Sequence, residues 1–234
     1  ENGHAIGYFW GYKTAGLFQN QKEINDWIAA GNGIYQADVK PGDVKYVDVN
    51  HDGVINASDK VDLGNGLSKY TFGFNVNLAW KGFDLSANFT GAAGFQIAQS
   101  YRDPSSSQAN YSRRILKRWT GEGTSNEIPR VTYGDVGNWL FSDLYLQDGD
   151  YIRLQNLTMG YDFKKLISWK GLSKMRLYFQ VQNLFTLTKY DGMDPEIGSF
   201  NGTNGNSSDS WVSGVDMGYY PHPRTFIVGL NLAF

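Results

Sequence analysis

The 234-residue sequence contains no cysteine. Its absence excludes disulfide bonds, thiol nucleophiles and cysteine-ligated metals. Histidine is scarce, and its three copies, His4, His51 and His222, are scattered without a paired nucleophile. A catalytic triad is therefore unsupported, and no phosphate-cradling glycine loop is present. We predict that the protein is not an enzyme.

Strong net charge and long apolar runs are missing too. The formal net charge is −2, which gives no reason to expect a nucleic-acid partner. No segment has the continuous apolarity of a membrane-spanning helix. A membrane β-barrel is not excluded by this, because its strands alternate apolar and polar residues and average to a polar score.

Aromatic residues and glycine are abundant instead. Aromatics make up 15% of the chain and there are 28 glycines, as aromatic girdles, small lumen residues and tight turns of a barrel would produce. The stretch 224–234 alternates with period two. Its large apolar residues are Phe226, Val228, Leu230, Leu232 and Phe234. This stretch alone fits a core strand of a soluble sandwich and the closing strand of an outer-membrane barrel about equally.

Residues 70–90 predict a β-hairpin with Lys81-Gly82 as its tight turn. On the first strand apolar and aromatic residues alternate with short, neutral ones, and the second strand follows the same pattern. Each strand has about ten residues, enough to cross a bilayer at the tilt of a barrel. Aromatic residues stand at the strand ends, where membrane-interface girdles lie.

Further strands are expected at 150–163, with a bulge near Asn156, and at 175–185. Short helices are expected at 21–30 and at 108–119, the second with a solvated basic face. Long loops separate these elements, and loops of such length argue against a compact soluble domain. The expected loops are 91–107, 120–149 and 192–220.

Residues 48–59, DVNHDGVINASD, have the spacing of a calcium-binding loop. Oxygen donors recur as calcium requires, and Gly53 stands where such a loop turns sharply. The proposed ligands are Asp48, Asn50, Asp52, Val54 (through its carbonyl), Asn56 and Asp59. We predict a structural Ca²⁺ in an insert at 43–62. The alternative is an Asx-rich turn that holds itself together without an ion.

Several segments, in order and spacing, resemble the C-terminal third of the SusC/RagA family of TonB-dependent outer-membrane transporters of Bacteroidetes. The segments are PGDVKYVDVNHDGVINASDKVDLGN, YTFGFNVNLAWKGFDLSANFTGAAG, RWTGEG, EIPR, DYIRLQNLTMGY, LYFQVQNLFTLTKYDGMDPE and GVDMGYYPHPRTFIVGLNLAF. The NLTMGY, QNLFTLTKY and YPHPRTF blocks are distinctive.

The resemblance implies an all-β fold, the C-terminal segment of a large antiparallel transmembrane β-barrel with 22 strands in the family, long extracellular loops and one or two short helices. Residues 1–234 would be one barrel portion lacking the plug and the TonB box, completed by an N-terminal remainder. The resemblance further implies a cell outer-membrane location, a SusD-like surface lipoprotein as lid, and TonB-dependent import of glycans or peptides.

Loop aromatics are the candidates for substrate contact, because they could stack on sugars or hold a peptide backbone. The candidates are Trp139, Tyr145, Trp211 and Tyr219. Packing within the loops or in a girdle is the competing explanation for each. The alternative function is a secreted, calcium-stabilised β-sheet module that binds carbohydrate.

Overall fold

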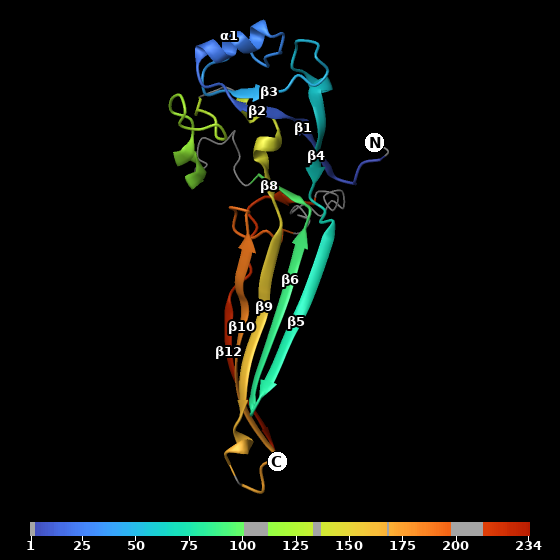
Figure 1. Ribbon diagram of the computed structural model, residues 1–234, viewed down its shortest axis with the longest axis vertical. Coiled ribbons are helices and arrows are strands. Elements are labelled where there is room, and N and C mark those ends of the chain that lie inside the picture. The colour runs from blue at the N-terminus through green and yellow to red at the C-terminus, as the bar shows by residue number, and fades with distance from the viewer. Residues whose placement is uncertain (1–2, 101–111, 133–136, 168, 198–212) are drawn as a thin grey trace, which may run out of the picture. The chain divides into compact units, whose positions relative to one another are not determined.

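The computed structural model describes residues 3–100, 112–132, 137–167, 169–197 and 213–234 (Figure 1). The chain divides into two compact units. Unit 1 consists of Glu1–Gly66, Ile97–Gln147 and Gly198–Gly218, and unit 2 consists of Leu67–Gln96, Asp148–Ile197 and Tyr219–Phe234. In the part of the chain described, no helix is long and apolar enough to cross a membrane.

Unit 2 is built on one five-stranded antiparallel sheet with the order β12-β10-β9-β6-β5. Its strands are β5 (Tyr70–Trp80), β6 (Phe83–Ala93), β9 (Tyr151–Asp162), β10 (Lys174–Thr188) and β12 (Thr225–Ala233). The predicted hairpin, the two middle strands and the last strand are confirmed. Lys81 and Gly82 have φ values of 46° and 98°, so both residues of the turn are left-handed, as a two-residue hairpin loop that follows the strand twist requires.

The predicted irregularity near Asn156 is also confirmed. Between Asn156 and Leu154, β9 advances two residues while β6 advances one, from Asn88 to Phe89. Gln155 is therefore the extra residue of a bulge. The bulge keeps Ile152 and Leu154 on the same face as Leu157, Met159 and Tyr161, although the apolar positions change from even to odd along the chain.

The register of the four strand pairs gathers most large apolar side chains of the sheet on a single face. This apolar face is open: Leu78 is 59% exposed, Phe226 62% and Val228 71%. The opposite face carries short polar side chains at the alternate positions. Among them are Asn75, Asn77, Ser86, Asn88, Thr158 and Gln180.

One ion pair crosses a whole strand on the polar face. Arg176 of β10 donates from Nε and Nη2 to Asp84 of β6, at 2.8 and 2.5 Å, across the intervening β9. The guanidinium passes over Gly160, where a Cβ would come within 2.6 Å of it. A larger residue at position 160 would displace the guanidinium, and the pair ties β10 to β6 through a bidentate, charge-assisted contact.

Unit 1 contains short strands and one α-helix. Strand β1 (Tyr8–Tyr12) pairs with β4 (Lys60–Asn65), β2 (Thr14–Leu17) pairs with β3 (Val44–Tyr46), and β7 (Gln96–Gln99) lies between β11 and β8. The last two strands are β11 (Val215–Asp216) and β8 (Leu146–Asp148). The buried core residues are Tyr12, Leu17, Val44, Tyr46 and Ile55, with Trp119, Leu140 and Leu144 packed against them.

The predicted first helix is confirmed as α1 (Gln21–Ala29). The Asn20 side chain accepts from the amide of Glu23 at 2.9 Å, and the Glu23 carboxylate accepts from the amide of Gln19 at 2.6 Å. These bonds satisfy free amides at the start of the helix, as N-terminal capping does.

The three expected loops and the second helix need correction. Strand β8 lies within 120–149 and strand β11 within 192–220. The span 91–107 is not loop throughout, because β6 continues to Ala93 and β7 occupies Gln96–Gln99, while 101–107 lies outside the described residues. The second helix is only a 3₁₀ turn, η2 (Arg113–Lys117), capped by Ser112, and 108–111 is not described. Other 3₁₀ turns are η1 (Ala57–Asp59), η3 (Gly137–Trp139), η4 (Asp143–Tyr145) and η5 (Phe163–Lys165).

Candidate ligand pocket

A buried carboxylate organises the loops of unit 1. Asp43 is 1% exposed and accepts from Arg130 Nε and Nη2 at 2.6 and 3.0 Å. Asn138 Nδ2 donates to the same carboxylate at 2.8 Å, and the amide of Lys40 donates at 2.8 Å. Residues 40–43 are thereby joined to the distant segment that carries Arg130 and Asn138, as a buried carboxylate with full hydrogen bonding can do.

Asn138 also fixes the turn that carries Trp139, because its side chain binds both Asp43 and β3. Its Oδ1 accepts from the amide of Val44 at 2.9 Å, and the preceding carbonyl, of Gly137, accepts from the Tyr46 hydroxyl at 2.7 Å. Two hydrogen bonds, from Val44 and Tyr46, thus hold the turn η3 against β3. Trp139 itself is 42% exposed.

Tyr145 belongs to the next turn, η4, and its hydroxyl donates to the carbonyl of Asn138 at 2.9 Å. The start of η4 is bound to β2, because Asp143 accepts from the Thr14 hydroxyl at 2.6 Å and from its amide at 3.2 Å. Trp139 and Tyr145 therefore come from two turns connected by hydrogen bonds, each anchored separately to the core.

Both rings line one cavity of about 190 Å³. Its wall is mainly apolar, with a few charged and amide groups at the border. Besides the two rings, the wall contains Gln99, Ser112, Arg114, Ile115, Glu127, Ile128, Pro129, Arg130, Val131, Asn138 and Leu144. Pockets of this composition bind ligands through apolar contact, and the few polar groups set the orientation.

The structure thus brings together two of the four predicted contact residues. Tyr219 lies in unit 2 and is 44% exposed, so it is not part of this cavity. Trp211 lies outside the described residues. Sequence reasoning missed Asp43, Arg130 and Asn138, and the only available signal was the PGD turn at 41–43 and the EIPR segment.

The predicted calcium loop is closed by its own backbone. Asp48, 2% exposed, accepts from the amide of Gly53 at 2.7 Å. Asp59, fully buried, accepts from the amides of Val49 and Asn56 at 2.9 and 2.8 Å. Gly53 has φ +80°, the left-handed conformation that the sharp turn requires.

The amide of Val54 and the Asn50 side chain lower the pKa of Asp52, so this carboxylate is ionised at neutral pH. Within the described ranges, no group of three or more His, Cys, Asp or Glu residues is gathered as a metal site. Calcium binding stays a prediction.

A second buried charge cluster lies in unit 2. Arg153, 3% exposed, forms a short ion pair with Asp194, 5% exposed, and donates to Glu196 at 2.7 Å. The amides of Glu196 and His222 donate to Asp194 at 2.9 and 3.1 Å. Burial acts to raise the pKa of Asp194, but these amides, the imidazole and Arg153 outweigh it, so the pKa lies below its usual range.

Long antiparallel strands with one open apolar face and one polar face define a class of protein. They form the wall of an outer-membrane β-barrel, where lipid replaces a protein interior. No family model matches the chain. Comparison with individual proteins does find relatives, and these narrow the kind of outer-membrane barrel.

The chain is 33% identical over 234 residues to TonB-dependent receptor P3 of Formosa agariphila, covering 99% of this chain and 22% of that receptor. It is 29% identical over 205 residues to TonB-dependent receptor SusC of Bacteroides thetaiotaomicron, covering 86% and 18%. The RagAB peptide importer in its open-open state matches with a TM-score of 0.64 at 19% identity, over 97% of this chain and 22% of that one.

Over most of its length the chain is similar to TonB-dependent receptors of the SusC type, and receptors of this type lie in the outer membrane. It spans about a fifth of the length of the curated relatives that it matches. A five-stranded sheet is accordingly a portion of a barrel wall, and the predicted all-β fold is confirmed.

Proposed function

We propose that the chain forms part of the wall and the extracellular loops of a receptor that imports glycans or peptides, driven through TonB. The observation that carries this proposal is the apolar face of unit 2, on which most of the large apolar side chains are exposed. The similarity to TonB-dependent receptors and to a peptide importer supports import as the activity.

The same sheet supports the N-terminal remainder of the barrel as a partner. In the residues described, β5 and β12 each pair with a single strand and form the two edges of the sheet. Unpaired edges in a membrane are costly, because lipid cannot satisfy backbone amides and carbonyls. Further strands would therefore flank this segment on both sides. A SusD-like lipoprotein lid is proposed on the likeness to SusC and RagAB.

For substrate contact we propose the cavity beside Trp139 and Tyr145. Its wall offers ring faces for stacking, and Arg114, Glu127 and Gln99 offer charge and hydrogen bonds. Ring stacking serves a sugar, whereas apolar contact with a charged border serves a peptide. Both classes remain in the proposal, and binding measurements with each class separate them.

The test replaces Trp139 with alanine in the receptor that contains this chain. Uptake and affinity for the transported oligosaccharide or peptide are expected to fall about tenfold or more, as when a central aromatic anchor is lost. Trp10→Ala is the matched control, because Trp10 lies in the same unit, is 43% exposed and does not line the cavity. Equal losses in the two variants would contradict the assignment of the cavity.

We further propose that Asp48–Asp59 binds Ca²⁺ as a structural ion. The ligand spacing, the left-handed Gly53 and the ionised Asp52 support it. Isothermal titration with Ca²⁺ should detect binding in the wild type and none in Asp52→Ala, with Asp26→Ala as the control. Equal affinity in both variants and the wild type would refute this ligand set, and no heat in the wild type would leave the ion-free Asx turn as the explanation.

The alternative function, a secreted calcium-stabilised carbohydrate-binding module, makes a different prediction. Such a module would be a freely soluble monomer that binds glycan without detergent. The importer proposal requires detergent or lipid to keep unit 2 in solution, because its apolar face is exposed. Sedimentation of the purified chain with and without detergent distinguishes the two functions.

A further inference from the structure

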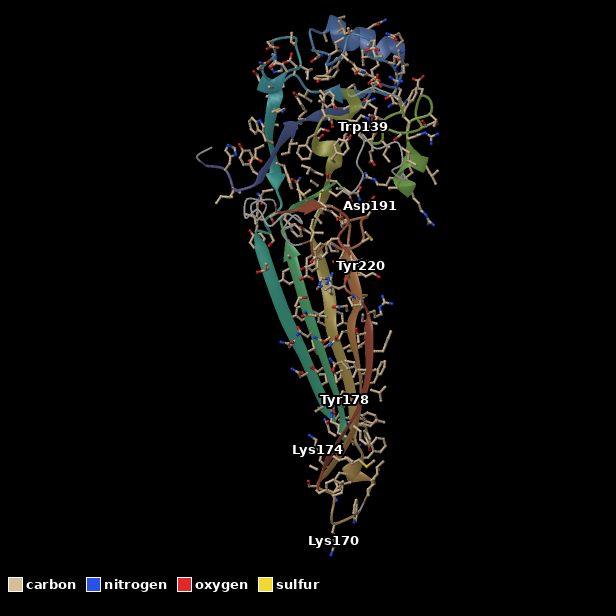
Figure 2. All side chains as sticks on the ribbon, turned by 180° about the vertical axis from the view of Figure 1, so that it is seen from behind. Trp139, Lys170, Lys174, Tyr178, Asp191 and Tyr220 are labelled. Atoms are coloured by element: carbon tan, nitrogen blue, oxygen red, sulfur yellow. The ribbon has the colours of Figure 1, made fainter. Side chains whose placement is uncertain are left out.

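One end of the unit-2 sheet carries an excess of positive charge beside exposed aromatic rings. Lys81 lies in the β5–β6 turn, Lys164 in η5, and Lys170 in the connection that leads to β10. We call these three residues the lysine rim. The amide of Asp162 donates to the carbonyl of Gly82 at 2.9 Å, so the two turns that carry the rim are bonded to each other. Figure 2 shows Lys170 at the tip of this end of the sheet.

The carboxylates at this end are already engaged. Asp84 is held by Arg176 through two bonds, and Asp162 accepts from the amide of Lys164 at 3.0 Å. None of the three rim lysines forms an ion pair within the described part of the chain. At the other end of the strands the charges are mixed, and Lys189 lies 3.8 Å from Asp148.

Aromatic rings separate the lysine rim from the apolar face. Trp80 is 67% exposed, Phe83 59% and Trp169 60%. Lys81 Nζ lies 4.8 Å from the centre of the Trp80 ring, and Lys164 Nζ donates to the carbonyl of Trp169 at 2.7 Å. Along the last part of β5 the order is thus Val76 and Leu78, then the Trp80 ring, then the Lys81 ammonium group in the turn.

This order matches the layers of a phospholipid leaflet. Aliphatic side chains suit acyl tails, tryptophan suits the interface, and lysine reaches the headgroup layer. Ammonium groups that form no ion pair with the described residues attract anionic headgroups at that depth, by about fivefold in affinity for each lysine. We propose that the lysine rim binds the phosphate of an anionic phospholipid whose acyl chains lie on the apolar face.

Lys174 provides a matched control. It is exposed and lies at the same end, but it pairs in register with Ala233 and shares the polar face with Arg176. A lysine on that face is directed away from the acyl chains. Its replacement should leave lipid binding almost unchanged, although it removes the same charge from the same end of the sheet.

The experiment uses the receptor containing this chain, purified in a neutral detergent and offered phosphatidylglycerol or phosphatidylcholine of identical acyl chains. Bound lipid is measured by native mass spectrometry, and folding by the heat-dependent shift on gels. The wild type should retain phosphatidylglycerol preferentially, Lys81→Gln/Lys164→Gln/Lys170→Gln should lose that preference by about a hundredfold, and Lys174→Gln should keep it.

Equal retention of the two lipids by the wild type would overturn the proposal. So would a folded triple variant that keeps the preference, or an equal loss in Lys174→Gln. If the triple variant does not fold, single Lys81→Gln and Lys170→Gln variants should each weaken the preference about fivefold. Substrate uptake is measured separately, so a failed import proposal would not be mistaken for a failed lipid site.

Discussion

Unit 1 and unit 2 come from one chain but place their apolar side chains oppositely. In unit 1, Leu17 is fully buried and Phe18 and Ile24 are each 1% exposed. In unit 2, large apolar side chains such as Leu78 and Val228 lie open at 59% and 71%. The difference is not one of composition, because both units are rich in aromatic and branched residues.

The comparison shows that the surrounding medium decides where apolar side chains lie. Unit 1 has an interior, and it joins its loops there through the buried Asp43 carboxylate. In unit 2 most large apolar side chains of the sheet are exposed, and the strands satisfy their backbone groups by pairing with one another, which is what lipid demands of a spanning structure. Substitutions that would be severe in one unit are therefore expected to be mild at similar positions in the other.

The largest effect is expected from Asp43→Ala in unit 1. The change removes the acceptor of Arg130, Asn138 and the amide of Lys40, and leaves a partly buried guanidinium without its carboxylate. Breaking a buried ion pair from one side costs about 3 to 5 kcal/mol. Chemical denaturation of the chain in detergent, followed by the fluorescence of the unit-1 tryptophans, measures the loss.

Asp38→Ala is the control for Asp43→Ala, because Asp38 is an exposed carboxylate in the loop just before it. It should change the unfolding free energy by less than about 0.5 kcal/mol. If both variants lost stability equally, Asp43 would not be the residue that joins the loops of unit 1.

A somewhat smaller effect is expected on the apolar face of unit 2. Val76→Arg places a charge in the middle of β5 on that face, at a position already 38% exposed. In a water-soluble body such a change is nearly neutral, whereas near the middle of a bilayer arginine on a barrel costs about 2 to 4 kcal/mol. Folding titrations in phospholipid vesicles give the value directly.

The neighbouring residue supplies the control for Val76→Arg. Asn77 is exposed on the same strand but lies on the polar face, where it pairs in register with Ser86. Asn77→Arg should fold in vesicles with little loss. Similar costs for Val76→Arg and Asn77→Arg would show that both faces meet the same medium, and the contrast between the units would fail.

The sheet of unit 2 was predictable because its information is local. Alternation along a single strand identifies both faces, and Lys81-Gly82 identifies the hairpin turn. Even the bulge was visible, as a slip in the alternation near Asn156. What alternation could not predict is Arg176 reaching Asp84 over Gly160, since that contact depends on the register of three strands.

The sequence predicts single residues of the pocket but not their arrangement in space. The sequence identifies Trp139 and Tyr145 as loop aromatics. It does not show that they line one pocket, because that arrangement depends on contacts of Asp43 with Arg130 and Asn138, which are distant in the sequence. The short helix expected at 108–119 failed for a related reason. Its apolar spacing fits a helix, yet Ser112 caps only a 3₁₀ turn, and Ile115 and Arg114 serve the pocket wall.

The smallest effect is a pH dependence in unit 2, from a buried charge that resembles Asp43 of unit 1. The pKa of Asp194 is lowered in the folded chain relative to the unfolded value of about 3.9. Its contribution to stability is therefore fully present above the unfolded pKa, and it is lost as the pH falls through the folded pKa. The loss is expected to be on the order of 1 kcal/mol, comparable to a hydrogen bond or two.

Asp194→Asn isolates this contribution from the protonation of Glu196 and His222, which face the same carboxylate. The variant should be less stable than the wild type at pH 7, and the two should converge as the pH falls through the folded pKa of Asp194. Thermal melts across that range measure the difference, and hydrogen exchange at the amides of Glu196 and His222 localises it. A constant gap between the two curves would mean that Asp194 acts through packing, so that unit 2, unlike unit 1, uses no buried charge to hold its loops.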